Sequence, residues 1–203
     1  FTAIGRIEIA KGNLSSLYTN APGGVINFFT DKYFPTSFVL TDNEFGSYDL
    51  RKNGLKVGVK TDRERFMATY SYENYQGYRA HNNEYQNRFN SIYEADISDN
   101  EKILINGYYV SGLIKLPGSL TLEQYNANDL QANARDVSRD AKRETDKGRL
   151  GISYNSYFSK DNKNFIEVTG YGTIKEFVRT NATYRIFNRY GLGASFRFIN
   201  KST

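Results

Sequence analysis

From Phe45 onward, apolar and polar side chains alternate with a period of two residues over most of the chain. In the clearest run, 189–198, the apolar residues are Tyr190, Leu192, Ala194, Phe196 and Phe198. Because successive side chains of a β-strand point to opposite faces, this pattern indicates strands with one apolar face. It predicts an all-β fold of about eight strands, over 45–52, 55–60, 66–73, 88–97, 101–112, 149–158, 164–178 and 189–198.

The expected connections fall into two classes. Asn53-Gly54 is a typical tight-hairpin signal, and 62–64, 99–101 and 161–163 read as short polar turns. The links 76–84, 113–147 and 179–183 are longer, and the segment 122–135 within the longest has the composition of a short surface helix. Short turns at one end and long loops at the other are typical of an outer-membrane barrel, which places 113–147 on the extracellular side.

The second face of the predicted strands is rich in Gly, Ser, Asn and Arg, which suits a polar lumen behind a lipid-facing wall. The candidate lumen-facing residues are Lys56, Lys60, Glu73, Arg88, Glu94, Arg149, Arg189 and Arg197. A mean hydropathy of −0.63 and the lack of a long apolar run exclude a transmembrane helix, but not spanning strands. The alternative is a soluble β-sandwich or surface adhesin domain, in which the aromatic residues fill a core.

Composition removes several function classes. The chain has 27 Lys and Arg interspersed with 22 Asp and Glu, which disfavours a nucleic-acid-binding face. It has no cysteine, and its single histidine, His81, rules out a histidine cluster for a metal, so no intrinsic metal or cofactor is expected. No nucleophile–base pair, metal-ligand spacing or nucleotide motif is present, so an enzyme is not expected.

The opening block differs from the rest of the chain. Segment 7–10 alternates as a strand, 14–18 has the pattern of a helical turn, and 25–29 predicts a second strand. Gly23 and Gly24 after Pro22 indicate a turn, since no Gly-Lys-Ser pattern supports a phosphate loop.

The stretch RIEIAKGNLSSLYTNAPGGVINFFT resembles the closing segment of the plug domain in TonB-dependent outer-membrane receptors. The matching positions are Arg6, Ile7, Glu8, Lys11, Gly12, Leu17, Tyr18, Gly23, Gly24, Val25, Ile26 and Asn27. The phrases GYRAHNNEYQN, 77–87, and LPGSLTLEQY, 116–125, are similar to the iron-chelate receptors of this family, nearest the ferric-citrate group. Thr19-Asn20 departs from the glycine that the family commonly has after its tyrosine.

The resemblance implies a fragment: residues 1–36 as the end of a small α/β plug and 37–203 as the first part of a transmembrane antiparallel barrel. Outer-membrane transporters with a plugged lumen have about 22 strands, so the energy-coupling box, most of the plug and the later strands are expected elsewhere in a longer polypeptide. It also implies an outer-membrane location in a Gram-negative bacterium and a TonB-type inner-membrane energy-coupling partner. Membrane lipid, lipopolysaccharide and a surface lipoprotein are further implied partners. The plug residues Arg6, Glu8, Lys11, Gly12, Tyr18, Gly23, Gly24 and Asn27 would have structural or gating roles.

The implied cargo is a ferric chelate of siderophore or citrate type, with a glycan or a peptide as alternatives. Because arginine makes bidentate bonds to carboxylates, the candidate ligand-binding residues are Arg79, His81, Arg88, Arg135, Arg139 and Arg143. The competing interpretation is that Arg79 holds a loop together and that the arginines of 135–143 are simply solvated. Iron would arrive already chelated.

Overall fold

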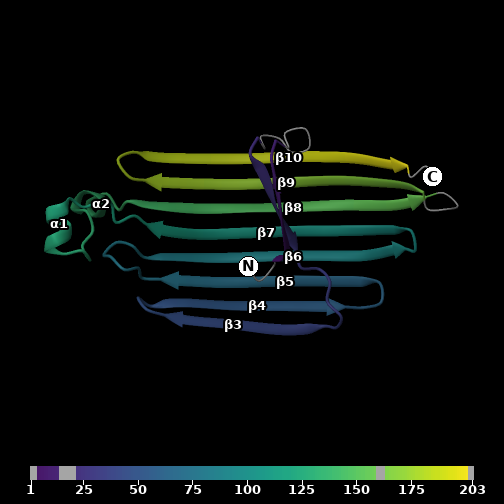
Figure 1. The fold of residues 1–203 in the computed structure, drawn as a ribbon, viewed down its shortest axis with the longest axis horizontal. Helices are drawn as coiled ribbons and strands as arrows, with labels where there is room; N and C mark the ends of the chain where they lie inside the picture. The colour runs from purple at the N-terminus through teal and green to yellow at the C-terminus, as the bar shows by residue number, and fades with distance from the viewer. Residues whose placement is uncertain (1–3, 14–21, 159–162, 201–203) are drawn as a thin grey trace.

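The computed structural model describes residues 4–13, 22–158 and 163–200, and most of these lie in one eight-stranded antiparallel sheet (Figure 1). Its strands pair in chain order, each with its sequence neighbours: β3 (Phe38–Gly46), β4 (Leu50–Lys60), β5 (Glu64–Tyr75), β6 (Glu84–Ser98), β7 (Glu101–Lys115), β8 (Lys142–Phe158), β9 (Asn164–Thr180) and β10 (Tyr184–Asn200). The predicted all-β fold and the number of strands are confirmed. The other sheet of the described residues, 4–11 with 24–30, has only two strands and covers a small part of this one, which argues against the sandwich alternative of two sheets packed face to face.

The first hairpin of the sheet is not where the sequence placed it. Asn53 and Gly54 lie inside β4, where the Asn53 side chain donates to Asn43 Oδ1 across the strand pair (2.7 Å). The chain instead turns at Tyr48 and Asp49, which both have positive φ (58° and 57°). Two such residues fit the right-handed twist of a hairpin. The predicted strand 45–52 is therefore wrong, because that range contains the turn.

The two long connections, 76–83 and 116–141, lie at one end of the sheet, as expected from the sequence (Figure 1). The third longer link, predicted at 179–183, is wrong, because β9 continues to Thr180 and only residues 181–183 join it to β10. The longest is 116–141, narrower than the predicted 113–147, because β7 and β8 continue as a paired ladder to Lys115↔Lys142. It contains α1 (Leu122–Ala127) and α2 (Ala134–Ser138), so the predicted surface helix is present and is followed by a second. The turns 61–63 and 99–100 lie at the other end, and 161–162 falls outside the described residues.

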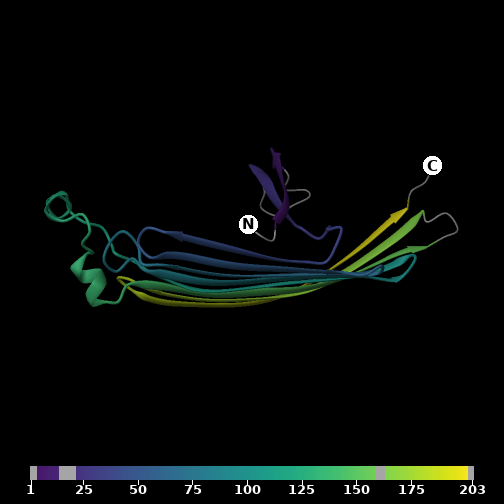
Figure 2. The same ribbon diagram turned by 90° about the horizontal axis from the view of Figure 1, so that it is seen from below.

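The opening block forms a separate two-stranded sheet, β1 (Ile4–Lys11) with β2 (Gly24–Thr30). It lies over one side of the large sheet and runs across its strands (Figures 1 and 2). Gly12 and Gly24 both have positive φ (111° and 139°), and a Cβ at Gly24 would lie 2.6 Å from the Ala10 carbonyl oxygen, so glycine is required there. The helical turn predicted at 14–18, with Tyr18, lies outside the described residues.

The two faces of the large sheet are named from the segment 31–37, which joins β2 to β3. We call the face that carries Lys56 and Glu94 the inner face, because both side chains contact this segment. The small packed core lies there: Met67 and Ile92, paired across β5 and β6, are buried. The outer face is apolar and open, with Leu192 93% exposed and Phe196 67% exposed. No helix within the described ranges has the length and apolar character needed to cross a membrane.

Candidate functional site

The register places the predicted lumen-facing residues on one face. Residues that lie opposite one another on neighbouring strands share a face of the sheet. From Glu94, the pairs Glu94↔Arg65, Glu94↔Leu104 and Leu104↔Ser153 therefore identify the inner-face residues of β5, β7 and β8. By this alternation the inner-face set includes Lys56, Lys60, Glu73, Arg88, Glu94, Arg149, Arg189 and Arg197. That this face bounds a lumen stays a prediction.

Some of these charges hold the segment 31–37 to the large sheet. Glu94, whose side chain is 11% exposed, accepts from Lys32 Nζ (2.6 Å) and from Arg65 Nη1 (3.2 Å). Lys56 Nζ donates to Asp31 Oδ2 (2.7 Å), and Lys60 Nζ donates to the Pro35 carbonyl (3.1 Å). The segment is therefore fixed to β4 and β6 at several points, and the Arg65 guanidinium of β5 lies 5.6 Å from the centre of the Tyr33 ring. The β1–β2 sheet projects from this segment.

The pKa of Lys32 reflects this contact. Burial alone lowers it, but the hydrogen bond and the charge of Glu94 outweigh burial, and the pKa is raised above 10.5. A raised pKa in the folded state means that the contact contributes its full stability below about pH 10.5 and loses it as the pH rises through the folded value.

Cations gather on the inner face of β8, β9 and β10, near the loop end. Two rows of three lie directly opposite one another across the strands: Arg143↔Arg179↔Arg185 and Lys147↔Lys175↔Arg189. Arg149 follows on β8, with its guanidinium 4.2 Å from the centre of the Tyr171 ring. We call these seven residues the inner basic face, and all of them are exposed.

The inner basic face lacks acidic partners. None of its side chains forms an ion pair with a described acidic residue. The nearby acids Glu144, Asp146 and Glu176 have the opposite strand parity and lie on the outer face. Like charges directly opposite one another on a sheet destabilise it. An anion bound between the rows would relieve this repulsion.

A hollow of about 250 Å³ adjoins the two rows. Its lining includes Arg143, Lys147 and Lys175, with Gln86 and Phe177 among the uncharged residues. The Phe177 ring lies 5.9 Å from the Phe187 ring and the same distance from Lys175 Nζ, so an apolar strip separates the two rows of cations. The arrangement suits a multiply charged anion that also has an apolar or planar part.

The other candidate ligand residues have different surroundings. Arg79 donates from Nε to the Gln131 carbonyl and from Nη1 to the Gly118 carbonyl (2.9 Å each). His81 Nε2 lies 3.0 Å from the Ala141 carbonyl oxygen. These contacts join the loop 76–83 to the segment 116–141, as the competing interpretation of Arg79 holds. A role in ligand binding stays a prediction for both residues.

Arg88 binds Glu73 with two nitrogens (3.1 Å each), so its charge is already compensated within the wall. Arg135 and Arg139 are exposed at α2, and Arg143 belongs to β8 and not to the loop. The structure thus joins Arg143 to Arg149 and Arg189, which the sequence had assigned to different roles. Lys147, Lys175, Arg179 and Arg185 were missed. The signal was present for Lys147 and Arg185, which share the parity of Arg149 on β8 and of Arg189 on β10, whereas Lys175 and Arg179 join the group only through the register of β9.

Two groups in the loops have shifted pKa values. The hydrogen bond from Tyr78 to Asp129 raises the pKa of Tyr78 to about 12. The hydrogen bond from Lys115 lowers the pKa of Asp140 below its usual value. No group of three or more His, Cys, Asp or Glu side chains in the described part of the chain is arranged to hold a metal ion.

The plug-motif residues lie on the small sheet and its ends. Arg6 pairs with Glu8 (3.0 Å) and covers the Phe29 ring, at 4.3 Å from its centre. Glu8 is opposite Asn27, and Lys11 is opposite Gly24. A gating role for these residues stays a prediction.

No family model matches the sequence. Solved structures do match it, over nearly its whole length. The ferric citrate transporter FecA in its unliganded form matches 98% of the chain with a TM-score of 0.76 and 16% identity. The pyoverdine outer membrane receptor FpvA from Pseudomonas aeruginosa PAO1, bound to pyoverdine, matches 95% with a TM-score of 0.70 and 15% identity. The FpvAI–pyocin S2 complex matches 96% with a TM-score of 0.68 and 16% identity.

The chain has the fold of part of a TonB-dependent receptor. It spans 31% of the FecA chain, 31% of the FpvA chain and 28% of the matched chain in the pyocin complex, that is, about a third of such a receptor. In this fold the eight-stranded sheet is a section of the barrel wall.

Proposed function

We propose that the chain is part of a TonB-dependent outer-membrane importer and that the inner basic face binds an anionic ferric chelate on its way through the barrel. The observation that carries the cargo proposal is the pair of three-cation rows without acidic partners among the described residues. The structural neighbours that carry names of bound or transported compounds, ferric citrate and pyoverdine, support an iron chelate as the class. They are receptors or transporters, which also supports a function other than catalysis.

In this proposal the chain's own residues do two things. The inner basic face attracts and orients the anion, because a cluster of one charge sign with low-dielectric walls concentrates oppositely charged solutes. The contacts of Asp31 and Lys32 hold the segment after β2 to the wall, so a pull on the plug from a TonB-type partner would act on the residues before it. Iron is cargo, carried within the chelate.

The cargo proposal is tested with the full-length receptor in detergent, by equilibrium binding of ferric citrate and of an uncharged trihydroxamate ferric chelate. We expect ferric citrate to bind, with an affinity that falls as salt is raised, because salt screens exposed charges. Lys147→Met with Lys175→Met removes two of three cations from one row. At roughly 1.5–3 kcal/mol for a hydrogen bond to a charged group, this double variant should weaken ferric citrate binding at least tenfold.

Lys102→Met is the matched control, because Lys102 lies on the same face at the opposite end of the strands, where it pairs with Asp96 (3.0 Å). It should leave ferric citrate binding unchanged. Equal binding of the charged and the uncharged chelate, or an unaltered affinity in the double variant, would overturn the anionic cargo. Binding of oligosaccharides or peptides alone would assign the cargo to those classes. Uptake that persists in cells without the TonB-type protein would overturn the transport mechanism.

A further inference from the structure

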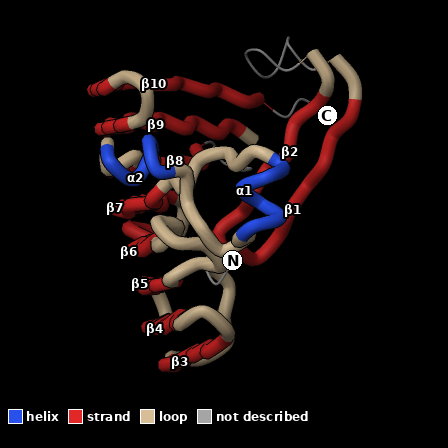
Figure 3. The backbone as a smooth tube through the Cα atoms, turned by 90° about the vertical axis from the view of Figure 1, so that its left-hand side faces the viewer, coloured by secondary structure: helices blue, strands red, loops and turns tan. Residues whose placement is uncertain are grey.

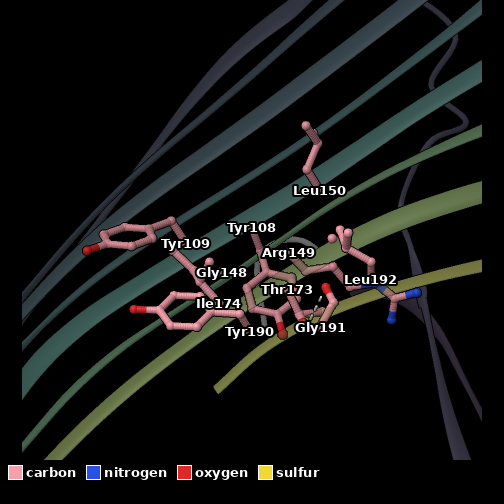
Figure 4. A pocket seen from close by; sticks show the side chains of 11 residues that line it. Tyr108, Tyr109, Gly148, Arg149, Leu150, Thr173, Ile174, Tyr190, Gly191 and Leu192 are labelled. Carbon is pink, nitrogen blue, oxygen red and sulfur yellow. Dashed lines mark hydrogen bonds between the residues drawn. The ribbon is translucent and has the colours of Figure 1, made fainter. Parts of the chain in front are cut away.

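The outer face of β8, β9 and β10 carries a groove whose floor is made of glycines. Gly170 and Gly172 are successive outer-face positions on β9, opposite Ile152 and Leu150 on β8, and Ile174 is the next outer-face residue of β9 toward the loops. Two adjoining hollows, of about 820 and 600 Å³, lie here and share Leu150, Gly172 and Leu192. Figure 4 shows side chains that line the larger one. A Cβ at Gly170 would meet nothing within 4 Å, so the floor is open at that point.

The two sides of the groove are apolar ridges from the flanking strands. Leu150 and Ile152 form the ridge on β8, and Tyr190 and Leu192 form the ridge on β10. All four side chains are exposed, and Leu192 is 93% exposed. From Gly148 to Phe158, from Asn164 to Ile174 and from Tyr190 to Asn200, the outer-face positions of the three strands include no charged residue.

The groove is polar at one end only. At the loop end, the Tyr109 hydroxyl donates to Asp146 (2.9 Å) and the Tyr190 hydroxyl donates to Glu176 (3.1 Å). Tyrosines with their hydroxyls on polar groups are typical of the interface between membrane and water. The larger hollow includes both tyrosines, passes Ile174, which lies between Glu176 and Gly172 on β9, and continues over Gly172 into the uncharged part of the outer face.

The width of the groove selects among apolar occupants. Neighbouring strands lie about 4.8 Å apart, so the ridges on β8 and β10 are roughly 10 Å apart between backbones. Their side chains narrow this space further. A helix with its side chains measures about 10–12 Å across and does not fit. A single hydrocarbon chain does, and the strand hydrogen bonds below it are already made, so no added strand can pair there.

We propose that this groove is a binding site for one acyl chain of a membrane lipid, with the lipid's polar end at the Tyr109–Asp146 and Tyr190–Glu176 belt. The proposal rests on the membrane location proposed above but not on the identity of the cargo. The missing side chains on β9 let the acyl chain lie against the backbone, where it contacts ridges on both sides.

The test uses the full-length receptor in phosphatidylcholine vesicles that contain a phospholipid with a photoactivatable diazirine on its acyl chain. After illumination, labelled peptides are mapped by mass spectrometry. We expect labelling of Leu150, Ile152 and Leu192 several-fold above that of Leu55, Val57 and Val59, which lie on the outer face of β4 without such a groove. The double variant Gly170→Leu with Gly172→Leu should lower the labelling of the groove residues to the labelling seen on β4.

Ala68→Leu is the matched control, since it adds the same side chain to the outer face of β5 and should leave the labelling of the groove unchanged. A heat-dependent gel mobility that matches the wild type shows that the filled variant is folded. Even labelling of both regions, or unchanged labelling in the filled variant, overturns the groove as a lipid site. Labelling of β4 with none in the groove would also overturn the lipid site, because it would show that another protein segment covers the groove. A receptor that does not insert into vesicles shows no label on either region, which overturns the membrane location itself.

Discussion

Glu94 is one of the residues that attach the segment after β2 to the large sheet. Its two carboxylate oxygens accept from different parts of the chain, Lys32 on the connecting segment and Arg65 on β5. With 11% of its side chain exposed, it is among the few nearly buried charges of the described residues, and such a charge is tolerated only when it is paired. Removal of this one carboxylate leaves two cations facing each other.

We therefore predict that Glu94→Gln loosens the segment 31–37 without unfolding the wall. Loss of two charge-assisted bonds, partly screened by solvent, should cost about 2 kcal/mol, which corresponds to a roughly 30-fold rise in local opening. Cleavage of the full-length receptor at Lys32 by a lysine-specific protease measures this opening. Glu167→Gln is the control, because its pair with the exposed Arg197 is worth little, and its cleavage rate at Lys32 should match the wild type. A rate unchanged by Glu94→Gln would contradict the role of Glu94.

The phenol of Tyr78 gives a second prediction at this scale. Its hydrogen bond to Asp129 favours the protonated phenol and raises the pKa of Tyr78 to about 12. The contact is therefore intact below about pH 10 and is lost as the pH rises through about 12. The ¹³Cζ resonance of tyrosine, assigned by its absence in Tyr78→Phe, reports the titration. Asp129→Asn should bring the midpoint back toward about 10. A midpoint near 10 in the wild type would show that the contact does not persist in solution.

At the scale of elements, the two main loops form one unit. Arg79 reaches from the loop 76–83 to carbonyls of Gln131 and Gly118, and the Ala80 amide donates to the Leu130 carbonyl (2.8 Å). Figure 3, which looks at the sheet from its loop end, shows α2 beside the ends of β8 and β9 and α1 on the side toward β1–β2. The short helices have no buried residues, so hydrogen bonds and not an apolar core hold this unit together.

We expect Arg79→Met to release the segment 116–141. Methionine retains much of the apolar volume of arginine but makes neither of its two bonds, and two bonds from a charged donor are worth roughly 3 kcal/mol before screening. Hydrogen exchange of the Ala80 and Asn133 amides, which are bonded to Leu130 and Pro117, should accelerate about 100-fold. Arg135→Met, at an exposed position on α2, is the matched control and should leave both rates unchanged. Equal protection in Arg79→Met would show that the loops are held by other contacts.

The elements also show what alternation can predict. It identified seven of the eight strands of the large sheet, because on these strands polar residues gather on the inner face and apolar residues on the outer face. It failed at β3, where Phe38 and Leu40 share the inner face with Asp42 and Glu44, so neither face is uniform. It failed at the first turn because positive φ was assigned to Asn53-Gly54 and not to Tyr48 and Asp49.

For the candidate site, the sequence supplied the residue types but not their grouping. Arg143 looked like a loop residue because 142–147 is strongly polar, and the ladder with β7 shows that it is strand. The two rows of cations depend on a register between β8, β9 and β10 that one sequence does not fix. The sequence shows which residues of one strand share a face, but it does not show which residues of neighbouring strands lie opposite one another.

At the scale of the whole molecule, the two faces have opposite chemistry across a single layer. Phe196 and Ser195 are adjacent in β10, yet the first lies on the apolar outer face and the second on the polar inner face. In a soluble protein a new charge at either exposed position would have a small effect. In a membrane wall the two positions are in different solvents.

We therefore predict opposite outcomes for Phe196→Arg and Ser195→Arg in the full-length receptor. Arginine on the lipid side of a barrel costs about 2–4 kcal/mol near the middle of the bilayer, whereas it is tolerated on the lumen side. The yield of folded receptor in the outer membrane, read from heat-dependent gel mobility, should fall strongly for Phe196→Arg and stay near wild type for Ser195→Arg. Equal yields would place both positions in water and contradict the membrane location.

The strictly sequential pairing of β3 to β10 has a consequence for how such a wall can change over evolutionary time. Each strand exchanges hydrogen bonds only with the strands before and after it in the chain. Duplication or loss of a hairpin therefore breaks no other pairing and moves no other residue to the wrong side. Circumference can thus be gained or lost two strands at a time, while the selectivity of each existing stretch of wall is inherited intact.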